Sequence, residues 1–248
     1  MQQILDPDHY VRTSPSRQRH AIFDAESLLL DPSRGVRHSL RCALFDVGCK
    51  LPADAFRHWS LRTPLREACA ILLGGHDPEL LDQACERYFH HFDETGRYLC
   101  TLRPGSLRLL SSLAVERRME LHYLTHIGVE AAARVLDVYG LRHFPRSVVT
   151  PEAPLPPGVR LPLLQHLVEN SEEPPSTWLL LSDHPCELLM AQRLHLRSIA
   201  LGYGRAPLPT LCALRPGAIA ASVGDVEDCL GQVGSLSLVR APDDHHVH

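Results

Sequence analysis

The sequence predicts an α/β fold, in which a parallel sheet with helices on both faces is interrupted by an all-helical segment. Two observations lead to this prediction. Short apolar runs alternate with helical patterns of 10–13 residues along most of the chain, as in βαβ units. A purely helical pattern at 33–102 breaks that alternation once, after the first apolar run. The helical segment is therefore an insertion, and two pieces of the α/β domain flank it.

The first strand is expected at about 20–24, where Ala21-Ile22-Phe23 form an apolar run. Inside the insertion, the apolar residues of 79–92 follow a 3.6-residue period, which is typical of an amphipathic helix. The stretch 64–73 behaves likewise, and the Gly74-Gly75 pair that follows it is a helix stop signal.

Beyond Pro104-Gly105 the pattern returns to alternation. The expected strands are 120–124, 147–150, 178–182, 198–202 and 218–222, and the expected helices are 105–117, 128–140, 161–170, 184–196 and 226–230. The sequence thus predicts an α/β core at 20–32 and 103–231, a helical insertion at 33–102, and flexible tails at 1–19 and 232–248.

Composition narrows the function classes. Of the 248 residues, 44% are hydrophobic and 22% charged, and a net charge of −4 gives no reason to expect nucleic acid or an anionic membrane as partner. No apolar stretch is long enough for a membrane span, and the N-terminal region lacks a signal-peptide pattern, so a cytoplasmic protein is expected. Eight cysteines without a CxxC pair and sixteen histidines without an HExxH spacing favour buried free thiols and mostly surface histidines over disulfides or zinc.

Polar residues gather where the predicted strands end. They are Asp24, Glu26, Thr125, Arg160, Asp183 and Glu187. The carboxyl ends of parallel strands meet at one edge of the sheet, where ligands bind. Four carboxylates there need a compensating cation, and oxygen ligands suit Mg²⁺. A hydroxyl and a guanidinium suit a phosphoryl group, an Asp can attack phosphorus, and a second acid can carry the proton.

Each of these residues also has a simpler interpretation. Asp183 and Thr125 are common helix-capping types, Glu187 is a typical exposed acid of a first helical turn, and Arg160 taken alone is a surface cation. The ordered set, with each member at a strand end, favours a shared site.

Five stretches occur in an order typical of a known family. They are IFDAESLLLD (22–31), LRTPLREACAILL (61–73), LRPGSLRLLSSLAVER (102–117), HYLTHIGVEAAARVLDVYGL (122–141) and SDHPCELLMAQRLHLRSIALGYG (182–204). Together they resemble the haloacid dehalogenase (HAD) superfamily, in its phosphoglycolate-phosphatase-like branch with a helical cap. The resemblance covers roughly 20–231 and implies a Rossmann-like, HAD-like core.

By position, the resemblance implies that Asp24 is a nucleophile that forms an aspartyl-phosphate. Glu26 would protonate the leaving oxygen and later activate water. Thr125, helped by the backbone amide of His126, would bind the phosphoryl oxygens, and Arg160 would supply the cation that the family places in the loop before the helix at 161.

The resemblance also implies a Mg²⁺ site and a cap that closes over the substrate. Asp24, Asp183 and Glu187 would hold the ion, with one contact from the backbone carbonyl of Glu26. Arg62, in the specificity stretch of the cap, would meet an anionic substrate, although a surface cation is the simpler interpretation.

Four departures from the family pattern bear on activity. Glu26 and Glu187 replace aspartates and keep the acid chemistry, while Ser27-Leu28 replace the Gly-Thr of the first motif. Val159 stands at the position of the family's lysine, with Arg160 next to it. All but one of the chain's 25 basic residues are arginine, which makes an arginine in this role plausible.

The expected activity is a Mg²⁺-dependent phosphatase for a small phosphorylated metabolite. The departures leave open a degenerate HAD-like protein that binds or regulates without turnover. A phosphotransferase or mutase uses the same residues and cannot be separated from a phosphatase by sequence.

Overall fold

The computed structural model describes residues 18–57, 60–75, 77–151 and 160–235. Its main sheet is parallel and has the strand order β5-β4-β1-β6-β7-β8. The strands are β1 (His20–Phe23), β4 (Glu120–Leu124), β5 (Ser147–Val149), β6 (Trp178–Ser182), β7 (Arg197–Leu201) and β8 (Ala218–Ala220). Most of both predicted tails, and the Pro-rich loop that carries Val159, lie outside the described residues.

Helices cover both faces of this sheet because successive strand residues point to opposite sides. Phe23 and Tyr123 lie on the face covered by α5 (Ser106–Ser111), α6 (Val129–Val138) and α10 (Asp225–Ser235). Ile22 and Leu180 lie on the face covered by α7 (Leu161–Glu169) and α8 (Pro185–Arg193). α9 (Leu208–Ala213) packs beside α8 through Leu211. The three-layer α/β architecture predicted from the alternating pattern is confirmed.

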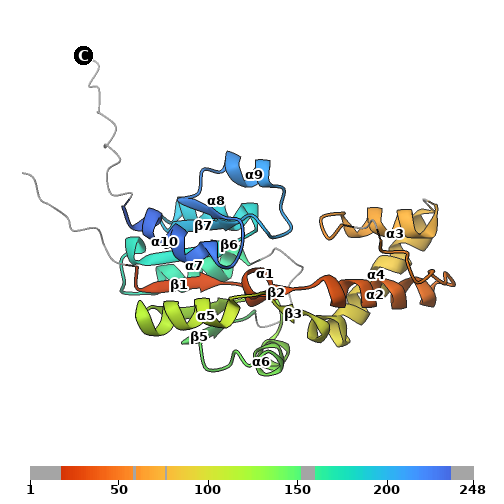
Figure 1. Ribbon diagram of the computed structural model, residues 1–248, viewed down its shortest axis with the longest axis horizontal. Coiled ribbons are helices and arrows are strands. Elements are labelled where there is room, and N and C mark those ends of the chain that lie inside the picture. Colours follow the sequence, from red (N-terminus) through yellow and green to blue (C-terminus); the bar gives the residue numbers. More distant parts are fainter. Residues whose placement is uncertain (1–17, 58–59, 76, 152–159, 236–248) are drawn as a thin grey trace, which may run out of the picture.

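The inserted helices leave and rejoin the core through two short strands (Figure 1). After β1 the chain forms α1 (Ala25–Leu29) and β2 (Leu30–Asp31), and it returns through η2 (Gly96–Leu99) and β3 (Thr101–Leu102). β2 and β3 pair antiparallel, so the outgoing and returning chains lie side by side. Between them α2 (Ser33–Asp46), α3 (Leu65–Leu73) and α4 (Pro78–Glu94) project beyond the end of the sheet.

The insertion has a hydrophobic core of its own, formed by residues of α2, α3 and α4 such as Leu40, Cys69 and Leu81. α2 also approaches η2 closely. A Cβ added to Gly35 would lie 2.0 Å from the carbonyl oxygen of Gly96, so only glycine allows this contact. Backbone packing therefore holds α2 against η2, the segment through which the chain returns to the core.

The elements that the sequence pattern did not predict are short. They are α1, α9, β2 and β3, each of six residues or fewer, in which no periodicity can be recognised. The helix expected at 105–117 is α-helical to Ser111 and then widens into a π-helical turn at Ser112–Glu116. Within the described ranges no helix is both long and apolar enough to cross a bilayer.

Candidate active site

Asp24 follows β1 and caps α1. Its Oδ1 accepts a hydrogen bond from the backbone N–H of Glu26 at 2.9 Å, and the hydroxyl of Ser27 lies 3.4 Å from Oδ2. Ser27 and Leu28 belong to the helix that Asp24 caps, and none of the residues of α1 has a positive φ. The missing Gly-Thr is thereby explained, because the chain continues from the strand directly into a helix and needs no glycine turn.

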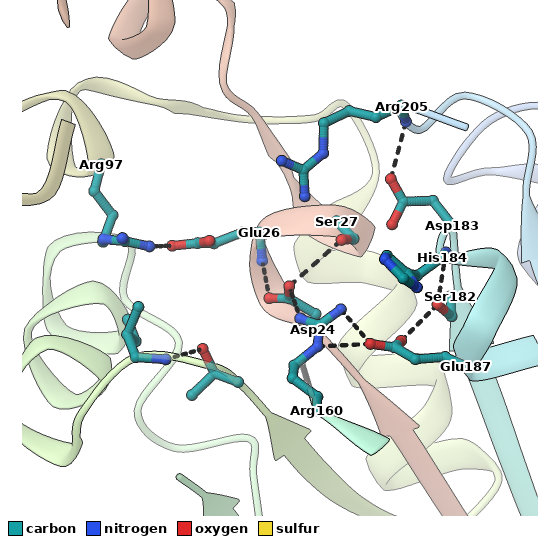
Figure 2. A network of polar contacts seen from close by, with 12 residues as sticks. Asp24, Glu26, Ser27, Arg97, Arg160, Ser182, Asp183, His184, Glu187 and Arg205 are labelled. Atoms are coloured by element: carbon teal, nitrogen blue, oxygen red, sulfur yellow. Dashed lines mark hydrogen bonds and ion pairs between the residues drawn. The ribbon is translucent and has the colours of Figure 1, made fainter. Parts of the chain in front are cut away.

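Arg160 lies in direct contact with Asp24 (Figure 2). It precedes α7, and its Nη1 donates to Asp24 Oδ2, while Nε and Nη2 both lie 2.6 Å from Oε1 of Glu187. The other oxygen of Glu187 accepts the hydroxyl of Ser182 at 2.7 Å. Arg160 and Glu187 are only 3% and 2% exposed, so neither is the surface residue that the simpler interpretation assumed.

Asp183 follows β6, the strand on the other side of β1 from β4. Its Oδ2 accepts the backbone N–H of Arg205 at 2.9 Å. A Cβ on the neighbouring Gly204 would lie 2.2 Å from the Cβ of Asp183, so a glycine is required where this chain passes the carboxylate.

Thr125 follows β4 and is fully buried. Its Oγ1 accepts the N–H of Ile127 at 3.4 Å, while the N-cap of α6 is Gly128. Because β4 and β6 flank β1, with neighbouring strands about 4.8 Å apart, Thr125, Asp183 and Asp24 lie at one edge of the sheet.

The sequence analysis missed Arg97. This residue of η2 is buried, and its Nη1 pairs with Oε1 of Glu26, while Nη2 lies 2.5 Å from Asp93. Its guanidinium also lies over the ring of Phe92, 5.2 Å from the centroid. Arg97 is 71 residues from Glu26 in the chain, so no local pattern could have linked them. The segment η2, through which the chain returns from the insertion, thus provides a cation for Glu26, the second acid of the site.

The surroundings shift the pKa values of the two acids in opposite directions. Burial would raise the pKa of Asp24, but the Arg160 cation, with His126 and the hydrogen bonds from Arg160 and the Glu26 amide, lowers it below its usual value. Burial raises the pKa of Glu26, and the Asp24 charge adds to this effect, while Arg97 opposes it only in part. Two carboxyl groups separated in this way are the pattern of an acid–base pair with distinct roles.

The residues present fit a divalent cation. Asp24, Asp183 and Glu187 are buried carboxyl groups and Glu26 lies beside them, and carboxylate oxygens are the ligands that Mg²⁺ prefers. Asp24, Glu26 and a ring nitrogen of His126 lie within 4.8 Å of one another.

Buried ring nitrogens also remain unpaired beside these acids. Among the described residues, Nδ1 of His126 and Nδ1 of His184 are buried without a hydrogen-bond partner. The predicted ligand Glu187 is held by Arg160 and Ser182 instead of pointing to an open position. Asp183, which no arginine side chain holds in Figure 2, is therefore better placed as an oxygen ligand than Glu187.

The remaining predicted residue, Arg62, is exposed and lies near the rim of the site. Its Nη2 donates to the carbonyl of Gly202 at 3.0 Å, two residues before Gly204, which packs against Asp183. The structure therefore brings an arginine of the insertion onto the loop after β7.

No protein-family model matches the chain. The fold itself is that of HAD-like hydrolases, as predicted. The structure is similar to a haloacid dehalogenase-like hydrolase from Streptococcus pneumoniae, at 20% identity and a TM-score of 0.65, over 85% of this chain and 97% of that one. It is also similar to a predicted phosphoglycolate phosphatase from Haemophilus somnus 129pt, at 15% identity and a TM-score of 0.63, over 85% and 97%.

Among curated sequences, the chain is similar to a 5'-nucleotidase from Pseudomonas aeruginosa. The two are 26% identical over 195 residues, which cover 78% of this chain and 87% of that protein. The alignment therefore spans most of both proteins.

Proposed function

We propose that the protein is a Mg²⁺-dependent phosphatase that hydrolyses a small phosphorylated metabolite through an aspartyl-phosphate on Asp24. The observation that carries this proposal is the arrangement of two acids two residues apart after β1, of which Asp24 pairs with Arg160 and Glu26 pairs with Arg97. Their surroundings shift the two pKa values in opposite directions. An Asp whose pKa is lowered is ready to attack, and a Glu whose pKa is raised keeps a proton to give. The similarity to HAD-like hydrolases and to a 5'-nucleotidase supports the same reaction class.

In the first step, an oxygen of Asp24 attacks the phosphorus of the bound ester. The bond from phosphorus to the leaving oxygen breaks, and that oxygen takes the proton of Glu26. The alcohol leaves, and the phosphoryl group stays on Asp24. Arg160, already in contact with Asp24, and Thr125 hold the phosphoryl oxygens in place.

In the second step, the Glu26 carboxylate takes a proton from a water molecule, whose oxygen attacks the phosphorus. The bond from phosphorus to Asp24 breaks, inorganic phosphate leaves, and both acids return to their starting states. Arg97 keeps the Glu26 carboxyl in one position during both proton transfers.

Asp24 and Asp183, with an oxygen of Glu26, are the residues that would hold Mg²⁺. When bound, this ion neutralises charge on the phosphoryl oxygens and on the crowded carboxylates. The chain's own contribution is to fix the acids by the Glu26 amide, Ser27 and the Arg205 amide.

The insertion supports a proposal for the substrate class. Its helices project beyond the end of the sheet, and its Arg62 contacts the loop after β7, which favours a small molecule over a protein substrate. Arg62 would meet an anionic part of that molecule, and the 5'-nucleotidase relative makes nucleoside monophosphates the first compounds to try.

A second candidate is a HAD-fold protein that binds a phosphorylated ligand without turnover. The observation that favours it is the ion pair between Arg160 and Asp24, which occupies an oxygen of the proposed nucleophile. A phosphotransferase or mutase remains the third candidate, and it differs only in returning the phosphoryl group to an organic acceptor instead of to water.

The test is a phosphate-release screen with Mg²⁺ over nucleoside monophosphates and other small phosphate esters. We expect release by the native chain and none above background by Asp24→Asn, with Asp54→Asn as a control away from the site. Both variants are first checked for native circular dichroism. Release that is equal in the native chain and Asp24→Asn, or absent from both on every substrate, contradicts the phosphatase proposal. Transfer of phosphate to an added alcohol or sugar without release would support the phosphotransferase.

A further inference from the structure

A second cluster of side chains that can bind a metal lies at the opposite end of the strands from Asp24, where β1 and β4 begin. His20, Glu120 and His122 each place one ligand atom within 4.8 Å of the others. His20 begins β1 and Asp24 follows it four residues later, so about 13 Å of strand separates the two groups. The cluster is therefore independent of the proposed phosphatase chemistry.

Strand register explains why these residues meet. His20 pairs with Glu120, and His122 pairs with Ile22, so all three side chains lie on the sheet face that α7 and α8 cover. Nδ1 of His20 is 3.1 Å from Nε2 of His122 and 3.8 Å from a carboxylate oxygen of Glu120. Two ring nitrogens 3.1 Å apart would subtend an angle of about 95° at an ion about 2.1 Å from each of them, so the rings must separate slightly to reach the tetrahedral angle usual for Zn²⁺.

The two rings are held in place by their neighbours. His20 stacks on Trp178 with the ring centroids 4.3 Å apart, and His122 packs against the same indole. Nδ1 of His122 is 2.8 Å from the hydroxyl of Ser147. If Nδ1–H of His122 donates to this hydroxyl, the lone pair of Nε2 is directed at His20. Metal-binding histidines usually donate their second ring N–H to an oxygen in this way.

The ring contacts also define the tautomers that binding needs. With Nδ1–H of His122 directed at Ser147, Nε2 of His122 carries the lone pair, and the proton of His20 must lie on Nε2 instead of Nδ1.

The cluster is accessible to an ion. A cavity of about 370 Å³ opens over His20 and Glu120. Arg19, Arg117 and Arg118 also line it, and Glu173 is paired with Arg19, so Glu120 is the carboxylate that remains for an ion. Glu120 is the most exposed ligand, with 53% of its side chain accessible, and it can turn toward the two rings without disturbing the core.

We propose that His20, His122 and Glu120 form a binding site for a divalent first-row transition-metal ion such as Zn²⁺. Two imidazoles and one carboxylate are ligands that suit Zn²⁺ and its neighbours better than Mg²⁺. The bound ion links the first residues of β1 and β4, at the ends of the strands remote from the proposed active site, and water molecules complete its coordination.

The test counts Zn²⁺ ions bound by the full chain in equilibrium dialysis. The native protein should bind one ion more than His122→Gln and one more than His20→Gln. The exposed His143 provides the matched control, because His143→Gln should bind as many ions as the native chain. Any Zn²⁺ held by the active site or by the histidines near the C-terminus is common to all variants and cancels in the comparison.

Two surface-side variants keep the test valid if a buried histidine variant fails to fold. Both Glu120→Gln and Ser147→Ala should keep the fold. Ser147→Ala should weaken Zn²⁺ binding at this site by about 10–100-fold, the effect usual for a lost supporting contact, and Glu120→Gln, which removes a ligand, should weaken it at least as much. Equal numbers of ions and equal affinities in the native chain, Glu120→Gln and Ser147→Ala would overturn the proposal. Phosphate release with Mg²⁺ should be the same in all of these variants, so failure here leaves the proposed phosphatase function unaffected.

Discussion

Replacing Arg160 by methionine removes the cation that lies between Asp24 and Glu187. Both carboxylates are then left buried without their partner, since all three side chains are at most 4% exposed. Breaking a buried ion pair by removing one partner costs about 3–5 kcal/mol. For a chain of this size, each kcal/mol lowers the melting temperature by about 2–4 °C. Arg160→Met should therefore melt about 6–20 °C below the native protein near neutral pH.

The assay is thermal unfolding followed by circular dichroism, with a matched variant as control. Arg19 also forms an ion pair, with Glu173 at 3.3 Å, but its side chain is 64% exposed. Exposed pairs contribute only about 0–1 kcal/mol, so the same substitution at Arg19 should change the melting temperature by a few degrees at most.

Acid should reduce the difference between the native chain and Arg160→Met. The pKa of Asp24 is lower in the folded than in the unfolded protein, because Arg160, His126 and the Glu26 amide together outweigh burial. Its contribution to stability is thus present above the unfolded value of 3.8 and is lost as the pH falls through the lowered folded value. A melting temperature of Arg160→Met within about 4 °C of the native one at neutral pH would refute the reasoning, because that is the largest change expected for an exposed pair.

Three further predictions concern the active site. Glu26→Gln should lower kcat for phosphate release by about 10²–10⁴-fold with native circular dichroism, because the proton donor is lost, whereas an unchanged kcat would remove Glu26 from the chemistry. Arg97→Met should shift the alkaline limb of the pH–rate profile to higher pH, because Arg97 lowers the pKa of Glu26, and an unmoved limb would mean that Glu26 does not set it. Gly204→Ala should abolish activity by displacing Asp183, while Gly75→Ala, whose Cβ meets nothing within 4 Å, should be active; equal activity of both would show that the position of Asp183 is unimportant.

Much of the fold could be predicted because the chain alternates clearly between apolar strands and amphipathic helices. The strand at 178–182 is buried throughout and was predicted with the correct bounds, since a short, mostly apolar run is typical of a strand in the interior of a parallel sheet. The helix α1 was missed, because five residues are too few to show a helical period and Ser27-Leu28 stand where the family has the Gly-Thr of its first motif. Only the structure shows that Asp24 is itself the helix cap, so that a glycine is unnecessary.

The residues of the candidate site that directly follow strands could be predicted. The contacts between residues far apart in the sequence could not. Asp24, Thr125 and Asp183 were found by their positions at strand ends. Arg97 was missed because it reaches Glu26 from the returning arm of the insertion. The expectation that histidines lie mostly on the surface was wrong for His20 and His122, which strand register brings together across 102 residues. Contacts of this kind depend on register, which a single sequence does not reveal.

The central claim is that Asp24 becomes phosphorylated during turnover. The direct measurement is mass spectrometry of the peptide that contains Asp24, after the reaction with an active substrate and Mg²⁺ is stopped rapidly with acid. We predict one added phosphoryl group on Asp24 in the native chain and none in Asp24→Asn. Phosphate release without any phosphoryl group on Asp24, or undiminished release by Asp24→Asn, would contradict the account.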